Sequence, residues 1–384
     1  MNVIEASIED LQTALASGAV TAEALLRAYL DRIAQYDSAG ICLNAVVVPN
    51  PHALDEARES DRRRAAGKPL SAFDGIPYTA KNSFKARGLT VAADSPAFAD
   101  LVAGDDAFVI ARLRAAGAIL IGLTNIPPMA NGGMQRGLYG RAESPYNADY
   151  MTAAFASGSS NGSGTATAAS FCAFGLGEET WSSGRAPAAN NALCAYTPSR
   201  GVISVRGNWP LVPTMDVVVP HTRTMVDMLA LLDVIVADDS DTTGDFWRSQ
   251  PWVDIPKAST VRPASYRALA GTADLRGKRF ALPAMYINAD PAAGSNPTGG
   301  IGGPTGQAIR TRTSFLALMM RAKAVLERAG AEVIVTDFPL VTNYEGDRPD
   351  APTIRTRGLV PPAYLEREIW DLSVWSWDTF LRAN

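Results

Sequence analysis

The chain has 384 residues, 47% hydrophobic and 19% charged, a composition typical of a globular protein with one large core or two fused ones. Its net charge of −4 gives no basic field that would attract nucleic acid or an anionic lipid surface. The N-terminus lacks a secretory pattern and no apolar run reaches about 18 residues, so neither secretion nor a membrane-spanning helix is expected.

Helices and strands are predicted to alternate along the first third of the chain. Residues 7–35 predict two helices, the first capped by Ser7 in a capping box with Asp10 and the second capped by Thr21. Five segments follow in chain order: a β-branched run at 44–48, an amphipathic helix at 51–66, a buried strand at 75–80, a helix at 106–116 and a second buried strand at 118–122. This alternation favours an α/β domain with a largely parallel sheet.

The later elements are spaced less evenly. Small polar residues at 157–164 precede an expected helix at 165–174 and an expected turn at 177–183. Further on, the patterns predict a helix at 224–236, a strand at 278–282, a helix at 314–329 and a strand at 332–335. A flexible loop is expected over 290–310, where glycine and proline are frequent. The Trp-rich segment 364–384 predicts a helix that needs a surface to pack on.

Cysteine and histidine are scarce. The three widely spaced cysteines, Cys42, Cys172 and Cys194, cannot form a full disulfide framework and show no metal-site spacing. We therefore expect a reducing, cytoplasmic environment, no metal and no cofactor. Only His52 and His221 occur, so a zinc site built on histidines is nearly excluded, and a Ser-His-Asp triad would have to use one of these two.

Three segments carry side chains suited to catalysis. The strand GIPYTA ends at Lys81; such a lysine is commonly exposed, but apolar surroundings would lower its pKa and make it a base. SGSSNGSG, at 157–164, lacks the Gly-Lys-Ser/Thr ending of a phosphate loop, which argues against nucleotide binding. GEETWSSGRAPA, at 177–188, is a tight turn with a serine pair. Each segment alone also fits a purely structural role.

Together the three segments resemble the amidase signature family. GIPYTAK is similar to the family's strand-lysine motif, SGSSNGSG to Gly-Ser-Ser-Gly-Gly-Ser, and GEETWSSGRAPA to Gly-Thr-Asp-Thr-Gly-Gly-Ser-Ile-Arg-x-Pro-Ala. Ser183 lies 24 positions after Ser159, which equals the family's spacing. The resemblance runs from about residue 7 to at least 340, and SGRAPAANN and TPSRG are most similar to the allophanate hydrolase-like branch.

The resemblance implies the α/β fold of that family, with a mixed, mostly parallel central sheet covered by helices on both faces. It implies one domain over 1–384 with a catalytic core at about 70–240. Family members usually continue beyond the point where this sequence stops, so we expect the C-terminal part of the fold to be missing.

The resemblance also implies the catalytic residues. Ser183 would be the nucleophile, Ser159 the bridging serine and Lys81 the terminal base, with an acyl-enzyme intermediate. The oxyanion would be held by the backbone N–H groups of Thr180, Trp181, Ser182 and Ser183.

Further residues of these segments admit more than one assignment. Met129, Ser160 and Trp181 are candidates for substrate binding, with core packing for Met129 and helix capping for Ser160 as equal alternatives. Arg185 and Glu179 are expected to pair and brace the nucleophile turn. His221 is expected to be structural.

Some positions depart from the signature. Trp181 and Ser182 replace two glycines, which suit a turn that approaches its ligand closely, and Glu179 replaces aspartate. Asn82 and Ser83 replace the Asp-Asn that follows the lysine. These changes bear on rate and substrate rather than on the catalytic groups.

The predicted function is that of an amidohydrolase that cleaves the C–N bond of a linear carboxamide, without nucleic-acid or membrane partners. Homodimerisation is left open. Two alternatives remain: a catalytically silent amidase-fold subunit, and a transamidating subunit that acts with a partner chain.

Overall fold

The computed structural model describes residues 1–132, 134–154, 157–271, 274–298 and 308–384. The chain forms two compact units, one of Met1–Ala270 with Trp370–Asn384 and the other of Gly271–Ile369. The single domain expected over 1–384 stays a prediction, because compact units within a chain need not be domains that fold separately.

The first unit begins with two capped helices, as the sequence predicts. In α1 (Ile8–Ala16) the Ser7 side chain accepts the N–H of Asp10, and the Asp10 carboxylate accepts the N–H of Ser7. In α2 (Ala22–Tyr36) the Thr21 side chain accepts the N–H of Ala24. These caps satisfy N–H groups that have no partner within the helix, so they fix where each helix starts.

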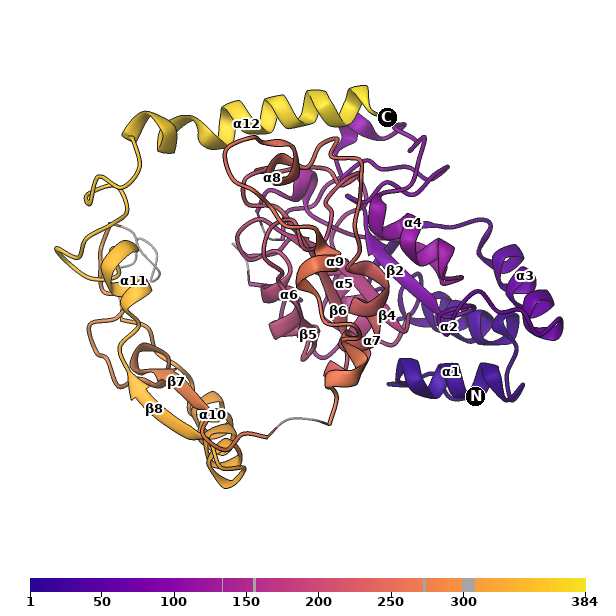
Figure 1. Ribbon diagram of the computed structural model, residues 1–384, viewed down its shortest axis with the longest axis horizontal. Helices are drawn as coiled ribbons and strands as arrows, with labels where there is room; N and C mark the ends of the chain where they lie inside the picture. The colour runs from indigo at the N-terminus through magenta and orange to yellow at the C-terminus, as the bar shows by residue number, and fades with distance from the viewer. Residues whose placement is uncertain (133, 155–156, 272–273, 299–307) are drawn as a thin grey trace. The chain divides into compact units, whose positions relative to one another are not determined.

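A six-stranded sheet forms the centre of the first unit (Figure 1). The strands are β1 (Val46–Pro49), β2 (Pro77–Lys81), β3 (Ile119–Thr124), β4 (Phe174–Glu179), β5 (Cys194–Ala195) and β6 (Val217–Thr222), in the spatial order β1-β3-β2-β4-β6-β5. Strands β3, β2 and β4 are parallel neighbours, whereas β1, β6 and β5 each pair antiparallel. Because β5 is antiparallel to β6, it runs in the direction of the three central strands. The sheet is mixed, as expected, with four strands in one direction, although only two of its five pairings are parallel.

Helices surround this sheet (Figure 1). They are α3 (Ala53–Ala65), α4 (Phe108–Ala115), α5 (Asn161–Ala168), α6 (Arg185–Asn190), α7 (Met225–Ile235), α8 (Phe246–Ser249) and α9 (Ala258–Val261), with the short 3₁₀ helices η1 (Pro96–Phe98), η2 (Pro128–Ala130) and η3 (Arg267–Leu269). Every residue of β2, β3, β4 and β6 is buried, which fits the apolar run of β3 and places Lys81 of β2, Glu178 and Glu179 of β4 and His221 of β6 in the interior. The α/β prediction is confirmed.

The predicted helix at 165–174 and turn at 177–183 are wrong in part. Helix α5 starts earlier, at Asn161, and ends at Ala168, and residues 174–179 form the central strand β4. A Cβ atom at Gly175 would lie 2.6 Å from the Ser163 Oγ, and one at Gly177 would lie 2.8 Å from the Ser160 Oγ. Small residues therefore occur in both elements because α5 packs closely on β4, so composition does not mark the boundary between them.

The second unit contains a parallel strand pair, β7 (Arg279–Pro283) and β8 (Glu332–Thr336), with helix α10 (Thr313–Arg328) between them in sequence. It also includes η4 (Ala284–Ile287), α11 (Pro339–Tyr344) and the start of α12 (Pro362–Arg382). The three elements predicted at 278–335 are confirmed. Of the expected flexible loop at 290–310, residues 299–307 lie outside the described residues.

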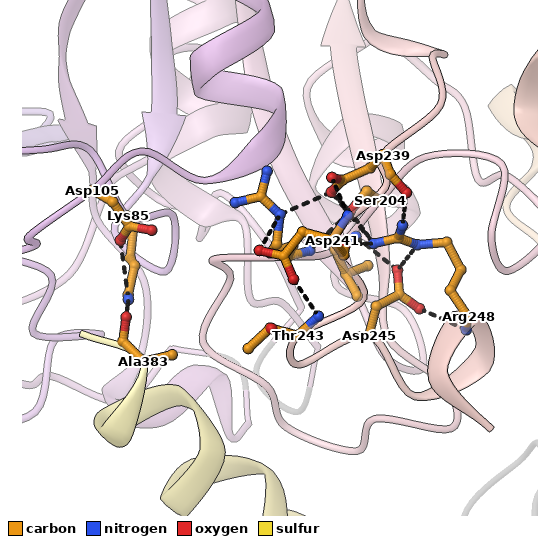
Figure 2. A network of polar contacts seen from close by, with 11 residues as sticks. Lys85, Asp105, Ser204, Asp239, Asp241, Thr243, Asp245, Arg248 and Ala383 are labelled. Carbon is orange, nitrogen blue, oxygen red and sulfur yellow. Dashed lines mark hydrogen bonds and ion pairs between the residues drawn. The ribbon is translucent and has the colours of Figure 1, made fainter.

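The C-terminal part of α12 belongs to the first unit and finds a packing surface there. Trp377 Nε1 donates to the carbonyl of Pro210 at 2.8 Å, and the rings of Phe380 and Trp209 stack with centroids 4.1 Å apart. Lys85 Nζ donates to the carbonyl of Ala383 at 2.9 Å (Figure 2). The helix expected at 364–384 is confirmed, although Trp370 remains 74% exposed.

A network of arginines and aspartates holds the segment that follows α7 (Figure 2). Arg248 Nε lies 2.7 Å from the Asp245 carboxylate, and its terminal nitrogens donate to the Ser204 hydroxyl and to the Asp239 backbone carbonyl. Each of these charged groups is paired with an opposite charge or a polar group. The network is therefore of the kind that stabilises a loop. No helix among the described residues is both long and apolar enough to cross a bilayer.

Candidate active site

Lys81 is the last residue of β2 and is fully buried. Its Nζ donates a hydrogen bond to the Ser159 Oγ at 2.7 Å and lies 3.1 Å from a carboxylate oxygen of Glu178. Burial lowers the pKa of Lys81, because the ammonium loses its hydration, and the negative charge of Glu178 opposes that shift. The strand thus delivers to the interior an amine that is easier to deprotonate than a surface lysine.

Ser159 lies in the turn that precedes α5 and is also fully buried, and the Gly158–Ser159 peptide bond is cis. The adjacent Ser160 joins this turn to the turn that carries Ser183 and to strand β4. Its N–H donates to the carbonyl of Ser183 at 3.0 Å, while its hydroxyl donates to the Glu178 carbonyl and accepts the Glu178 N–H. The two serine-bearing segments are therefore fixed side by side. The Ser160 hydroxyl bonds to the Glu178 backbone both as donor and as acceptor. Its expected contact with substrate stays a prediction.

Ser183 lies in the turn between β4 and α6, and Glu179 braces this turn. One Glu179 carboxylate oxygen accepts the N–H groups of Gly184 and Arg185, at 3.1 and 2.9 Å, and the other accepts Arg185 Nε at 2.7 Å. A terminal nitrogen of Arg185 donates to the carbonyl of Trp181 at 2.6 Å. The expected Glu179–Arg185 pair is confirmed.

The Ser183 side chain is largely buried, and its hydroxyl forms no hydrogen bond with a described residue. Likewise, the N–H groups of Trp181, Ser182 and Ser183 donate to no described residue, and the oxyanion role assigned to them stays a prediction. The Thr180 hydroxyl donates to Asp216 at 2.5 Å. The Ser182 hydroxyl donates to the carbonyl of Gly158 at 3.4 Å, which links the turn that carries Ser183 to the segment that carries Ser159.

His221, in β6, is buried and bonded at both ring nitrogens. Nε2 lies 2.9 Å from the Gly184 carbonyl, and because a carbonyl only accepts, this nitrogen carries the proton; Nδ1 then accepts from the Ser163 hydroxyl at 3.0 Å. Burial lowers the pKa of His221 to about 4. The expectation of a structural histidine is consistent with these bonds, because both ring nitrogens are engaged and neither contacts Ser159 or Ser183. His52 is exposed at the start of α3.

The other substrate-binding candidates occupy different surroundings. Met129 is half-buried in η2 and packs against the cluster that contains Trp209, with a left-handed φ of 55°. Trp181 is 47% exposed on the turn that carries Ser183. No described contact brings Met129 and Trp181 together.

Glu178 was not singled out by the motif comparison, because the signature has threonine at this position. The residue directly precedes Glu179, yet the two carboxylates have different partners, Lys81 for one and Arg185 for the other. Successive side chains of a strand point in opposite directions. Assigning 174–179 as a strand would therefore have predicted that Glu178 and Glu179 face different surroundings.

The amidase family model matches residues 24–271. A subunit of the glutamyl-tRNA(Gln) amidotransferase of Cereibacter sphaeroides is 32% identical over 343 residues, which cover 88% of this chain and 61% of that protein. A probable amidase of Arabidopsis thaliana is 31% identical over 294 residues, 73% of this chain and 54% of that protein. The chain therefore spans less than two thirds of the length of these curated relatives.

Solved structures agree with the sequence relatives. The native peptide amidase of Stenotrophomonas maltophilia is similar over 99% of this chain and 78% of its own, with a TM-score of 0.69 and 26% identity. A peptide amidase in complex with the competitive inhibitor chymostatin gives a TM-score of 0.71 over the same shares of both chains, also at 26% identity. The likeness to the allophanate hydrolase-like branch stays a prediction.

Proposed function

Because the chain belongs to the amidase family, we propose that it hydrolyses the C–N bond of a linear, non-peptide carboxamide through Ser183, Ser159 and Lys81. The observation that supports this assignment is the hydrogen bond of 2.7 Å between the Lys81 Nζ and the Ser159 Oγ, both fully buried. A lysine is rarely fully buried unless it is paired, because desolvating its charge is costly, and one of the partners of Lys81 is the Ser159 hydroxyl.

The proposed reaction starts with neutral Lys81. This amine accepts a proton from Ser159, and Ser159 accepts one from Ser183 as the Ser183 oxygen attacks the amide carbon. The N–H groups of residues 180–183 bind the oxyanion that forms. Ser159 then returns a proton to the departing nitrogen, which leaves as ammonia or an amine. Water hydrolyses the acyl-enzyme by the same relay. The reaction needs no cofactor or metal, and we propose that it takes place in the cytoplasm.

The acyl pocket is proposed to include Trp181, Met129 and Ser160. The large, half-exposed indole of Trp181 occupies a glycine position of the signature, so it would narrow the space beside the acyl carbon.

A panel of small carboxamides, with ammonia release as the readout, tests the proposal. Ser183→Ala and Lys81→Ala should each abolish turnover, whereas Ser38→Ala and Lys68→Ala, at exposed positions of the same residue types, should leave it unchanged. A fluorophosphonate probe provides a second readout that needs no known substrate, because it reacts only with an activated serine. A folded protein that neither turns over an amide nor reacts with the probe would refute the enzyme assignment and favour the alternative of a catalytically silent subunit.

A transamidating subunit is the second candidate, because a relative named as a subunit of glutamyl-tRNA(Gln) amidotransferase covers 88% of this chain. Such a subunit would release ammonia from glutamine and would require a partner chain. Ammonia release from glutamine that appears only after addition of a partner extract would favour it over an amidase that acts without a partner, as a monomer or a homodimer. Turnover of other small amides by the purified chain would count against it.

A further inference from the structure

Glu178 gives the buried lysine a second partner that the amidase signature does not include. The Lys81 Nζ lies 2.7 Å from the Ser159 Oγ and 3.1 Å from Glu178 Oε1. The other oxygen, Glu178 Oε2, accepts the side-chain amide of Asn208 at 3.1 Å. Asn208 thus fixes one oxygen of the Glu178 carboxylate, and the other oxygen contacts the Lys81 ammonium group. We infer that the orientation of the Lys81 side chain toward Ser159 depends on this carboxylate.

The remaining charged groups around Lys81 do not replace this carboxylate. Glu179 of β4 is neutralised by its bonds to Arg185, and His221 of β6 is held neutral because burial lowers its pKa to about 4. Asp216, which precedes β6, bonds to Thr180, and burial raises its pKa to about 7. Glu178 is the carboxylate in direct contact with the ammonium group among the described residues.

Glu178 also connects the lysine to a small cavity. This cavity has a volume of about 10 Å³ and is lined by Glu178, Asn208 and Asp216, together with apolar residues such as Trp209 and Val217. That volume suits a single water molecule. Asn208 Oδ1 is buried without a partner among the described atoms, so a water in this cavity would have a polar group to bind. Such a water could receive a proton that leaves the lysine.

We propose that Glu178 is a positioning residue of the relay: its carboxylate holds the Lys81 ammonium group against Ser159 and delays release of the lysine proton to more alkaline solution. The inference rests on the proposed function, because it concerns the base of the same relay. Activation consists of one proton leaving the Lys81 ammonium for solvent, which gives the neutral amine that later accepts the Ser159 proton. An adjacent anion favours the ammonium form, so it opposes this step.

The pH dependence of fluorophosphonate labelling tests the proposal without a known substrate. The rate constant for labelling is measured against pH for the wild type, Glu178→Gln and Glu178→Thr, the last of which restores the residue of the signature. Glutamine keeps the shape and the hydrogen-bonding oxygen but removes the charge. Both variants should therefore show the alkaline rise of labelling at lower pH, with a midpoint shifted by about 1–3 pH units. Glu23→Gln, on the exposed face of α2, should leave the midpoint unchanged.

The outcomes separate this inference from the function on which it rests. A wild type labelled at Ser183 whose midpoint equals that of both Glu178 variants overturns the role of Glu178 and leaves the hydrolase proposal standing. A folded Glu178→Gln protein that is labelled at no pH also overturns it, because glutamine keeps an oxygen that can hold the lysine and removes only the charge, which the proposal assigns to restraint of the proton. A wild type that is never labelled overturns the hydrolase proposal and this inference together. Two variants make the test robust to misfolding of either one.

Discussion

Replacing His221 with glutamine is expected to remove an acid sensitivity that this buried imidazole gives to the fold. In the native protein His221 is neutral, donates to the Gly184 carbonyl and accepts from Ser163. Glutamine can still donate to Gly184, so the variant should fold. Loss of the Ser163 bond and imperfect packing should lower the free energy of unfolding by about 1–3 kcal/mol near neutral pH.

The acid-dependent part follows from the pKa of His221. Its folded value is lowered to about 4, whereas the unfolded chain has the ordinary value of 6.5. As pH falls, the unfolded chain takes up the proton first, so the stability from this group is fully present above about pH 6.5 and is lost progressively down to about pH 4. Between about pH 7 and about pH 5 the loss is about 2 kcal/mol. Asp94 and Asp216, whose pKa values are raised to about 7, act in the opposite direction, but they are common to both proteins and cancel in the comparison.

Urea unfolding of the wild type and His221→Gln at the two pH values measures this difference directly. The gap in unfolding free energy between the two proteins should narrow on acidification by about 2 kcal/mol. The chain contains one other histidine, the exposed His52, so His52→Gln is a matched control that should follow the wild type at both pH values. An equal gap at both pH values would refute the argument that the fold keeps His221 neutral. If Ser183 labelling in His221→Gln were abolished while the protein stayed folded, the structural role of His221 would be refuted instead.

Three further changes follow from the packing. Phe380→Ala should destabilise the first unit by about 3–5 kcal/mol in denaturant titration, because it removes a buried ring stacked on Trp209; an unchanged midpoint would show that α12 does not dock there. Gly175→Ala should cost about 1–3 kcal/mol in the same measurement, since its Cβ would lie 2.6 Å from the Ser163 Oγ; an unchanged midpoint would count against close packing of α5 on β4. Arg185→Lys should slow fluorophosphonate labelling by about tenfold or more, because lysine lacks the planar guanidinium that bonds to both Glu179 and the Trp181 carbonyl and so braces the turn that carries Ser183. An unchanged rate would count against that brace.

Local chemistry predicted much of the fold. Ser7 and Thr21 could be assigned as helix caps because a hydroxyl just before an amphipathic run commonly accepts a free N–H of the first helical turn. Both side chains form the expected bonds. The apolar run that ends at Lys81 predicted a buried strand, and that strand lies in the middle of the sheet. Where a short pattern is tied to one backbone geometry, the sequence is sufficient.

The site was less predictable, because its geometry depends on contacts between segments that are distant in sequence. The likeness to the signature pointed to Lys81 and Ser159, and the structure brings their side chains together across 78 positions of chain. It gave no information about Glu178, since a carboxylate against a lysine becomes visible only when β2 and β4 are placed beside each other. The prediction of a helix at 165–174 was wrong in its bounds for a related reason. Small residues occur where α5 packs tightly on β4 as well as in turns, so they do not show where the helix ends.

The protonation of Lys81 is governed by two opposing effects of different origin. Burial favours the neutral amine and comes from β2 lying in the centre of the sheet, a feature of the whole fold. The charge of Glu178 favours the ammonium and comes from one side chain. A substitution at Glu178 can therefore move the pH at which the relay becomes active without disturbing the sheet. A change in the burial of Lys81 would move that pH only by altering the packing of the sheet itself. On the proposed mechanism, a chain with the signature's threonine at this position would retain the burial and lose the opposing charge, so its lysine would be deprotonated at lower pH than in this protein.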